Sequence, residues 1–358
     1  MLRLPKPKEI KNKKVLLRID INVENFNIHN IRFQNIQPTI KFLLKNKAKQ
    51  IIIISHLGRP RHKDPKYSLK KTLPVLEKVF NHKIVFYDKL DNLPSDKIVL
   101  LENIRFWKGE ENNDIDFAKK LAKLADIYIN EAFSVSHRQH ASVSAITKLL
   151  PSYYGFDFIR EIKQINEFKK SIKKPALMIL GGAKIKDKLP LIQKFNHKVN
   201  NIIIGGALAN TLLDMLGFNI GRSLTDKNII PQLRNLNFAK IILPFDFWVL
   251  DKNNTKQHRF VFEIQPSDNI LDVGNYSLEY FNDFVYRSKT IFWNGPMGYI
   301  EDKQFQQGTV GLVNLLKVSK AKILVGGGET LNFTKPIEHK QNVFVSTGGG
   351  ALLAELIK

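Results

Sequence analysis

The stretch ILGGAKIKDKL, Ile179–Leu189, continues a short apolar run and then carries two glycines and two lysines that stand four residues apart. An apolar run that ends in a glycine turn is typical of a buried strand followed by a phosphate-binding loop. The Walker pattern of nucleotide-binding loops needs four residues between its glycines and a Lys-Ser or Lys-Thr pair, and this stretch has neither. It therefore predicts an anion site of another kind, whose ligand has to be inferred from the rest of the chain.

Similar apolar runs recur along the whole chain and alternate with segments of helical periodicity. Continuous rather than alternating apolarity indicates strands buried on both faces, which is typical of parallel α/β sheets. The expected strands are Val15–Ile19, Ile51–Ile54, Ile84–Tyr87, Ile98–Leu101 and Ile127–Ile129 in the first half, and Ala176–Leu180, Ile202–Ile204, Ile241–Leu243, Thr290–Trp293, Ile323–Val325 and Val343–Val345 in the second. The predicted fold class is α/β, with two doubly wound, parallel-sheet, Rossmann-like domains.

A single helix is predicted between the two halves, at residues 155–172, because apolar residues stand three and four apart there. The Lys-Lys-Pro sequence at 173–175 ends this helix. We therefore expect an N-terminal domain at residues 1–154, a C-terminal domain at 173–345 and a last segment at 346–358.

The composition limits the partners and the location of the protein. The chain has no cysteine, so thiolate catalysis and cysteine-ligated metals are excluded. No apolar run approaches the roughly 20 residues of a membrane span, and the N-terminus lacks the apolar core of a secretory signal, so we expect a cytoplasmic protein without a membrane partner. The net charge of +23 raises nucleic acid as a partner. However, the lysines are scattered and Asn, Ile, Lys and Phe are frequent together, which indicates a coding bias and disfavours nucleic acid.

Polar side chains gather where the strands of the first half end. In open α/β sheets, ligands bind beyond the carboxyl ends of the strands. The residues at and after these ends, with Arg32 placed in the loop after the first strand, are Asp20, Asn22, Arg32, His56, Leu57, Gly58, Arg59, Arg105 and Arg138. Because the planar guanidinium group pairs with carboxylates and phosphates alike, four arginines at this edge predict a site for a small molecule with several negative charges.

The strand ends of the second half carry glycine instead. The glycine runs are Gly181–Lys184, Gly205–Ala207, Asn294–Gly298, Gly326–Thr330 and Gly348–Gly350. Glycines let backbone N–H groups approach phosphate closely, so five such runs at one edge predict an extended phosphate-bearing ligand, most simply a nucleotide. Lys184 and Lys188 are expected on one helical face, within reach of one phosphate chain. Glu301 and Glu329 are carboxylates that could hold Mg²⁺ or a ribose hydroxyl at this edge.

One domain for a small polyanion, one for a nucleotide and a helix between them are the layout of a phosphoryl-transfer enzyme. Such an enzyme has to close around its ligands, because water would otherwise compete as the acceptor. The sequence thus predicts a hinge-bending kinase.

From residue 15 to about residue 353 the chain resembles the phosphoglycerate kinase family. The segments that carry the resemblance are LLRIDINV, SHLGRP, LLENIRFWKGEE, HRQHAS, LGGAKIKDKL, IIGGALANTLL, WNGPMG, VGGGET and STGGGA. The resemblance implies a monomeric glycolytic enzyme that closes at a hinge. It would transfer the acyl phosphate of 1,3-bisphosphoglycerate to Mg-ADP, giving 3-phosphoglycerate and ATP, by direct in-line displacement.

The resemblance also implies roles for individual residues. It places the sugar-acid substrate on the arginine-rich set of the first half, and it names Arg32 and Lys184 as the catalytic residues that flank the moving phosphoryl group. Glu329 is implied as the ligand of Mg²⁺. The expected nucleotide-binding residues are Gly182, Lys184, Lys188, Gly205, Gly206, Asn294, Pro296, Glu301, Gly327, Gly328, Glu329 and Thr330.

Two departures from the family pattern stand out. Glu329 replaces an aspartate that is one methylene shorter, and the chain ends at Lys358 where the family continues with a tail, so residues 346–358 are expected to form a shortened hinge segment. The main alternative is a catalytically weakened kinase-like protein retained for binding a ligand or nucleic acid. Retention of every substrate arginine and of both lysines argues against that alternative. A NAD-dependent dehydrogenase is a third possibility, but no G-x-G-x-x-G follows the first strand.

Overall fold

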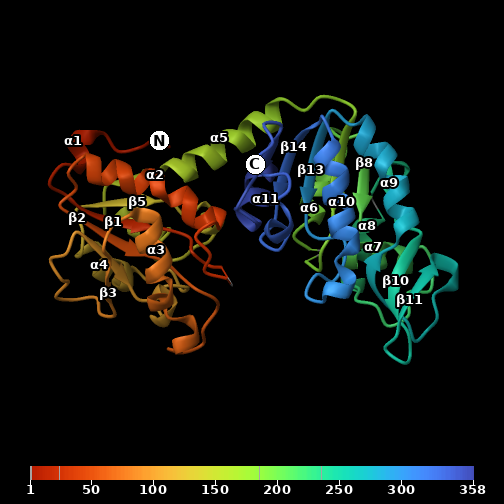
Figure 1. Cartoon of the computed structure of the whole chain (residues 1–358), viewed down its shortest axis with the longest axis horizontal. Coiled ribbons are helices and arrows are strands. Elements are labelled where there is room, and N and C mark those ends of the chain that lie inside the picture. Colours follow the sequence, from red (N-terminus) through yellow and green to blue (C-terminus); the bar gives the residue numbers. More distant parts are fainter. Residues whose placement is uncertain (1, 24, 185, 235) are drawn as a thin grey trace. The chain divides into compact units, whose positions relative to one another are not determined.

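The computed structural model of the chain describes residues 2–23, 25–184, 186–234 and 236–358. The chain divides into two compact units, Met1–Lys163 and Gln164–Lys358, which are called unit 1 and unit 2 and are described separately (Figure 1). No described helix combines the length and the apolar character that a membrane crossing requires.

Unit 1 is built around a six-stranded sheet with the strand order β3-β4-β2-β1-β5-β6, in which every neighbouring pair is parallel. The strands are β1 (Lys14–Arg18), β2 (Gln50–Ile54), β3 (Val85–Tyr87), β4 (Ile98–Leu101), β5 (Ile127–Asn130) and β6 (Ser152–Tyr154). The α-helices are α1 (Pro7–Ile10), α2 (Ile31–Lys45), α3 (Leu73–Phe80), α4 (Ile115–Ala122) and the first part of α5 (Phe156–Lys170).

Successive side chains of β1 enter two different cores, because side chains of a strand alternate between the faces of a sheet. Val15 and Leu17 pack in a core that includes Phe33 of α2 and residues of α3. Leu16 packs on the other face, in a core that includes Leu121 of α4. Helices therefore cover both faces of this sheet, as the continuous apolar runs predict.

Unit 2 contains a second six-stranded parallel sheet, with the order β15-β14-β13-β7-β8-β9. Its strands are β7 (Ala176–Leu180), β8 (Asn201–Ile204), β9 (Ile241–Ile242), β13 (Thr290–Asn294), β14 (Lys322–Gly326) and β15 (Val343–Val345). The helices are α6 (Leu189–Phe195), α7 (Gly206–Met215), α8 (Ile230–Leu233), α9 (Asn275–Arg287), α10 (Gln307–Val318) and α11 (Gly350–Ile357). Buried side chains of α9 and α10 form a core with β13 and β14.

The predicted fold class is confirmed, since both units are α/β and each holds a parallel sheet. Each of the predicted strands is present, with ends within one residue of the expected ends, and the helix predicted at 155–172 is α5. Unit 2 also has a three-stranded antiparallel sheet that was not predicted, formed by β10 (Asp246–Leu250), β11 (Lys256–Phe260) and β12 (Asn269–Val273), of which Figure 1 labels β10 and β11.

Candidate active site

The carboxyl ends of three neighbouring strands meet at one edge of the unit 1 sheet. Arg18, the last residue of β1, lies in register with Ile54 of β2 on one side and with Asn130 of β5 on the other. The segments that follow these strands therefore leave the sheet side by side. They carry most of the residues predicted for the small polyanion.

Arg32 and Asp20 form an ion pair at this edge, and the hydroxyl of Ser134 donates to the same carboxylate. The backbone N–H of Asn22 donates to the other oxygen of Asp20 at 3.0 Å. Arg32 does not lie in the loop where it was expected, but in the first turn of α2, whose N-terminus is capped by Asn30. Capping by the Asn30 side chain starts the helix before Arg32 and directs the arginine toward the strand end.

The loop from His56 to Arg59 is held from two sides. The backbone N–H of Gly58 donates to Asn22 Oδ1 at 2.7 Å, and Arg105 Nη1 donates to the Gly58 carbonyl at 2.5 Å. Gly58 has a φ of +62°, and a Cβ at this position would lie 2.3 Å from the ring of Tyr67. A glycine is required here both by the left-handed backbone and by the close aromatic ring.

Among the described residues, not every arginine of this site is paired with a carboxylate, so the site carries an excess of positive charge. Burial and the neighbouring Arg138 lower the pKa of Arg105 to about 10, against the opposing effect of Glu111 at 3.1 Å. Burial and then Arg59 lower the pKa of Arg138. Arg105 Nη2 is buried and has no hydrogen-bond partner among the described residues. An unpartnered guanidinium nitrogen among like charges is a donor available to an anionic ligand.

Two residues of this site were missed as functional residues by the sequence analysis. The amide of Asn103 is fully buried and donates to the carbonyls of Leu57 at 2.8 Å and Tyr67 at 2.9 Å, which fixes the loop that carries His56. Arg18 lies fully buried beneath the site. A charge inside the apolar run VLLRI was the available signal, because a charged side chain in a buried strand needs partners.

In unit 2, backbone hydrogen bonds join the predicted glycine loops to one another. Gly181 N–H donates to the Asn294 carbonyl at 3.0 Å, and Gly182 N–H donates to the Pro296 carbonyl at 2.7 Å. Gly206 N–H donates to the Met297 carbonyl at 3.2 Å. The loops after β7, β8 and β13 therefore form one connected surface.

The contact between two of these loops depends on glycine. Gly295 has a φ of +92°, and a Cβ there would lie 2.3 Å from the Gly181 carbonyl oxygen. A further link comes from the buried Thr330, whose hydroxyl accepts from the Gly295 N–H at 3.1 Å. The loop after β14, which contains Gly327 and Gly328, is thereby tied to the same surface.

The two lysines of the opening stretch are not on one helical face, contrary to prediction. Helix α6 begins at Leu189, with Pro190 in its first turn, so both lysines lie in the preceding loop, in which Ile185 is outside the described residues. Lys188 is buried and its Nζ donates to the Lys184 carbonyl at 3.3 Å, while the Lys184 side chain is exposed. The two ammonium groups consequently have different environments.

Burial lowers the pKa of Lys188 to about 8. The positive charge of Lys184 acts in the same direction, whereas Asp187 and Glu329 oppose it. Glu329 lies in the loop after β14, next to Thr330, whose hydroxyl accepts from the N–H of Gly295. By contrast, Glu301 is exposed, and no hydrogen bond or ion pair among the described residues links it to the glycine loops.

The fit of Mg²⁺ depends on the carboxylates at this edge. Among the described residues there is no group of three or more Asp, Glu or His side chains that could hold a metal ion. Mg²⁺ that accompanies a nucleotide needs only one or two carboxylates, since phosphate oxygens and water supply the remaining ligands. The exposed Glu329 meets that requirement.

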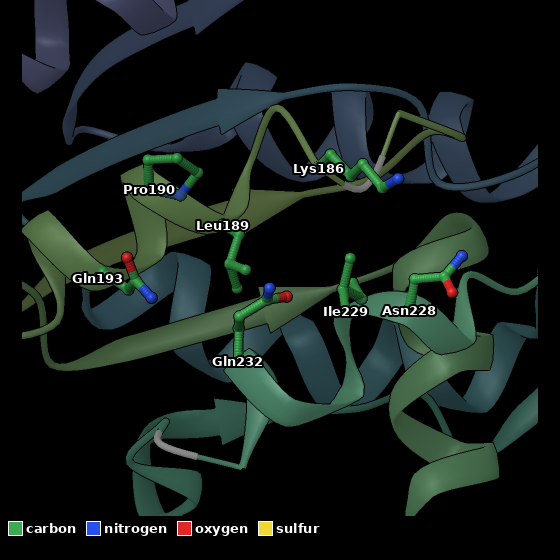
Figure 2. A pocket seen from close by; sticks show the side chains of 7 residues that line it. All are labelled: Lys186, Leu189, Pro190, Gln193, Asn228, Ile229 and Gln232. Atoms are coloured by element: carbon green, nitrogen blue, oxygen red, sulfur yellow. The ribbon is translucent and has the colours of Figure 1, made fainter.

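A hollow of about 360 Å³ lies beside the phosphate loop but contains none of the predicted site residues (Figure 2). It is lined by Lys186, Leu189, Pro190, Gln193, Asn228, Ile229 and Gln232. Lys186 belongs to the same loop as the two site lysines, and it forms an ion pair of 3.8 Å with Asp226. Lys186 is therefore a cation of the loop that has a partner away from the glycine surface.

An arginine-rich strand edge in one α/β unit and connected glycine loops in the other indicate a phosphotransferase. The model of the phosphoglycerate kinase family matches residues 6–357. The phosphoglycerate kinase of Wolbachia sp. subsp. Drosophila simulans is 38% identical over 371 residues, covering 96% of this chain and 93% of the relative. That of Helicobacter pylori strain J99 is 39% identical over 368 residues, covering 96% and 91%.

Solved structures agree with the sequence comparisons. The phosphoglycerate kinase of Pyrococcus horikoshii OT3 superposes with a TM-score of 0.84 at 26% identity, covering 100% of this chain and 96% of that one. The enzyme from Coxiella burnetii gives 0.75 at 30% identity, covering 97% and 94%. The chain belongs to the phosphoglycerate kinase family. It is an enzyme with phosphoglycerate kinase activity, and its substrates are a phosphoglycerate and ADP or ATP.

Proposed function

We propose that unit 1 binds 3-phosphoglycerate or 1,3-bisphosphoglycerate and that unit 2 binds the magnesium nucleotide. The acyl phosphate of 1,3-bisphosphoglycerate passes directly to ADP, giving 3-phosphoglycerate and ATP, and the reaction is reversible. The observation that carries this assignment is the group of Arg32, Arg105 and Arg138, whose charges act on His56, together with Arg59, whose charge acts on Arg138. The buried Arg105 Nη2, which lacks a hydrogen-bond partner among the described residues, supports this assignment because it is a donor available to an anion.

The assignment of the nucleotide rests on the connected glycine loops of unit 2. The two lysines supply positive charge, and those N–H groups of the loops that are not bonded to another part of the surface supply donors, which suit a chain of phosphates. We propose that Glu329 holds Mg²⁺, which supplies positive charge between the phosphates when it is bound. Glu301 is assigned to the nucleotide on the family resemblance alone.

The proposed chemistry needs charge neutralisation and alignment rather than a general base. In phosphoryl transfer, the three peripheral oxygens of the moving group carry negative charge while the attacking and leaving oxygens are in line. Lys184, whose side chain is exposed, is free to reach those oxygens, and Arg32 is the arginine that we assign to them from the substrate side. Cations that are already oriented stabilise the transition state because they need no reorganisation during the reaction.

Closure of the units, the oligomeric state, the location and the domain limits are further proposals. Direct transfer requires the two ligands to meet, so we propose that the units close during the reaction and exclude water. The family resemblance supports a monomer that works in the cytoplasm. The proposed domain limits are 1–154 and 173–345, with α5 as the connection and 346–358 as a hinge segment.

A coupled assay of ATP formation from 1,3-bisphosphoglycerate and ADP tests the proposed reaction. We expect turnover that depends on both substrates and on a divalent metal. The alternative, a weakened kinase-like protein kept for binding, predicts that calorimetry detects binding of 3-phosphoglycerate and ADP while turnover is absent. Binding to single-stranded DNA or RNA that falls steeply with salt would favour the nucleic-acid variant of that alternative.

A further inference from the structure

Arg18 is a fully buried cation that touches the substrate-site histidine from below. Its Nη2 lies 3.0 Å from Nδ1 of His56, and its Nε donates to the hydroxyl of Ser142 at 3.1 Å. Nη1 donates to the carbonyl of Ile19. The guanidinium is thus held at three of its nitrogens, and its position relative to the imidazole is fixed.

The charge of Arg18 is balanced on the side away from His56. The hydroxyl of Ser142 donates to Glu110 Oε1 at 2.7 Å, and its backbone N–H donates to Oε2 of the same carboxylate at 2.9 Å. The phenol of Tyr128 donates to the Ser142 carbonyl at 2.6 Å. This buried chain of hydrogen bonds holds Arg18 without drawing it away from the imidazole.

The contact with Arg18 determines which ring nitrogen of His56 carries the proton. A guanidinium has five N–H donors and no acceptor, so the nitrogen that it contacts must carry the lone pair. His56 Nδ1 is therefore unprotonated, and the ring proton lies on Nε2. Nε2 has no hydrogen-bond partner among the described residues, so its N–H is available to a ligand.

We propose that Arg18 is a positioning residue that keeps His56 as the neutral Nε2–H tautomer, so that His56 offers the substrate a hydrogen-bond donor rather than a charge. Arg18 acts through His56 and supplies its own charge from beneath the ring. Burial, followed by the charges of Arg18, Arg105, Arg138 and Arg32, lowers the pKa of His56 well below its usual value, which agrees with a neutral ring. The effect on substrate binding rests on the proposed placement of His56 in the substrate site, whereas the tautomer does not.

The tautomer is measured directly on the wild-type enzyme with ¹⁵N-labelled histidine. The shifts of the two ring nitrogens distinguish the Nε2–H tautomer, the Nδ1–H tautomer and imidazolium, and a His56→Gln variant identifies the signals among the nine histidines. We expect the Nε2–H tautomer from pH 6 to pH 8. An Nδ1–H ring or an imidazolium at pH 7 would overturn the proposal.

The dependence on Arg18 is tested with the double variant Arg18→Met/Glu110→Gln, which removes the cation without leaving its buried carboxylate charged. The matched control is Glu110→Gln, which alters the same buried network but leaves the contact of Arg18 with His56. We expect the double variant to lose the single tautomer and the control to keep it. Arg18→Lys, which retains a charged donor and no acceptor, should restore the Nε2–H tautomer, and a tautomer unchanged in the double variant would overturn the proposal.

The affinities for 3-phosphoglycerate and ADP distinguish a positioning role of Arg18 from a purely structural role. Loss of a donor to a charged group predicts an increase of about tenfold in the dissociation constant of 3-phosphoglycerate in the double variant, with ADP affinity unchanged. Equal weakening for both ligands contradicts the positioning role. Should His56→Gln bind 3-phosphoglycerate normally, the substrate role of His56 fails, and the nitrogen shifts still decide the tautomer.

Discussion

The backbone N–H of Gly182 donates a hydrogen bond of 2.7 Å to the carbonyl oxygen of Pro296. This bond joins the loop that carries Lys184 to the Asn-Gly-Pro turn that follows β13. The loop that carries Lys184 is therefore anchored at its glycine end through its backbone, and the exposed side chain of Lys184 takes no part in this bond.

Replacing Arg59 or Arg138 by alanine should weaken 3-phosphoglycerate binding and leave nucleotide affinity nearly unchanged. The physical reason is that both arginines belong to the proposed anion site of unit 1, where burial and then the charge of Arg59 lower the pKa of Arg138. Calorimetric titration of each ligand separately checks this prediction. Arg61→Ala is a matched control, because Arg61 is an exposed arginine of the same loop that was not assigned to the site. Equal loss for both ligands would show that the two sites are not independent.

Glu329→Ala should strongly raise the KM for the magnesium nucleotide. A glutamate extends the carboxylate by roughly 1.5 Å relative to aspartate, and Mg²⁺ accepts only near-ideal geometry at about 2.0–2.1 Å. Glu329→Asp should therefore be tolerated or should improve the use of Mg²⁺ relative to the larger Mn²⁺. Steady-state kinetics with both metals measures these effects. Unchanged metal dependence in Glu329→Ala would mean that another group holds the ion.

Nucleotide affinity should fall as the pH rises above about 8, the value to which burial lowers the pKa of Lys188. The ammonium form attracts phosphate, and in the free enzyme this form is lost as the pH passes the lowered pKa. Titration of ADP between pH 7 and pH 10 tests the prediction, with Lys188→Met as the variant that lacks the titrating group. The variant should bind weakly at every pH and without the same fall. A wild-type affinity that stays constant to pH 10 would contradict the assignment.

Glu131 should make the free energy of unfolding depend on pH. Burial, followed by the charge of Asp157, raises the pKa of its carboxyl from 4.5 to about 8 in the folded chain, where it accepts the backbone N–H groups of Asp157 and Phe158 at 3.2 and 3.3 Å. Between these two values the folded state holds a proton that the unfolded state has released. The contribution of this group is therefore present at low pH and is lost as the pH rises toward 8, by about 1.4 kcal/mol per pH unit.

Denaturant unfolding of the wild type and of Glu131→Gln from pH 5 to pH 8 measures this contribution. The amide keeps the shape of the side chain and does not titrate, so the variant should show a shallower decline. Asp157, whose pKa is also raised, remains in both proteins, and because its charge acts on Glu131, the difference between the two curves reports on the interacting pair. Parallel curves would show that Glu131 does not take up a proton on folding.

Most of the parallel sheets could be predicted from the sequence because their strands are apolar on both faces. Ile51–Ile54 is an uninterrupted example, and it lies within β2. The antiparallel sheet was missed although Phe247–Leu250 of β10 is a continuous apolar run, because the neighbouring strand β11 lacks this signal. The residues of β11, KQHRF, are partly buried and mostly polar, so only their pairing with β10 makes them a strand.

The site residues that directly follow a strand could be predicted from the sequence. Asp20, Asn22 and His56 follow strands that lie next to each other in the sheet, and parallel pairing brings such ends together. The relative positions of the side chains could not be predicted, because they depend on distant contacts. Examples are the hydrogen bond from Arg105 to the Gly58 carbonyl and the burial of Lys188, since neither follows from a local sequence pattern.

The central claim is that Lys184 neutralises charge that develops on the moving phosphoryl group, and the turnover of Lys184→Ala tests it most directly. The control is Lys186→Ala, which removes the same charge from the same loop at a side chain that pairs with Asp226. We expect Lys184→Ala to lower kcat on the order of 10²–10³ while changing either KM far less, as for a donor acting in the transition state. Lys186→Ala should keep near-normal turnover. Near-normal kcat in Lys184→Ala, or an equal loss in both variants, would contradict the claim.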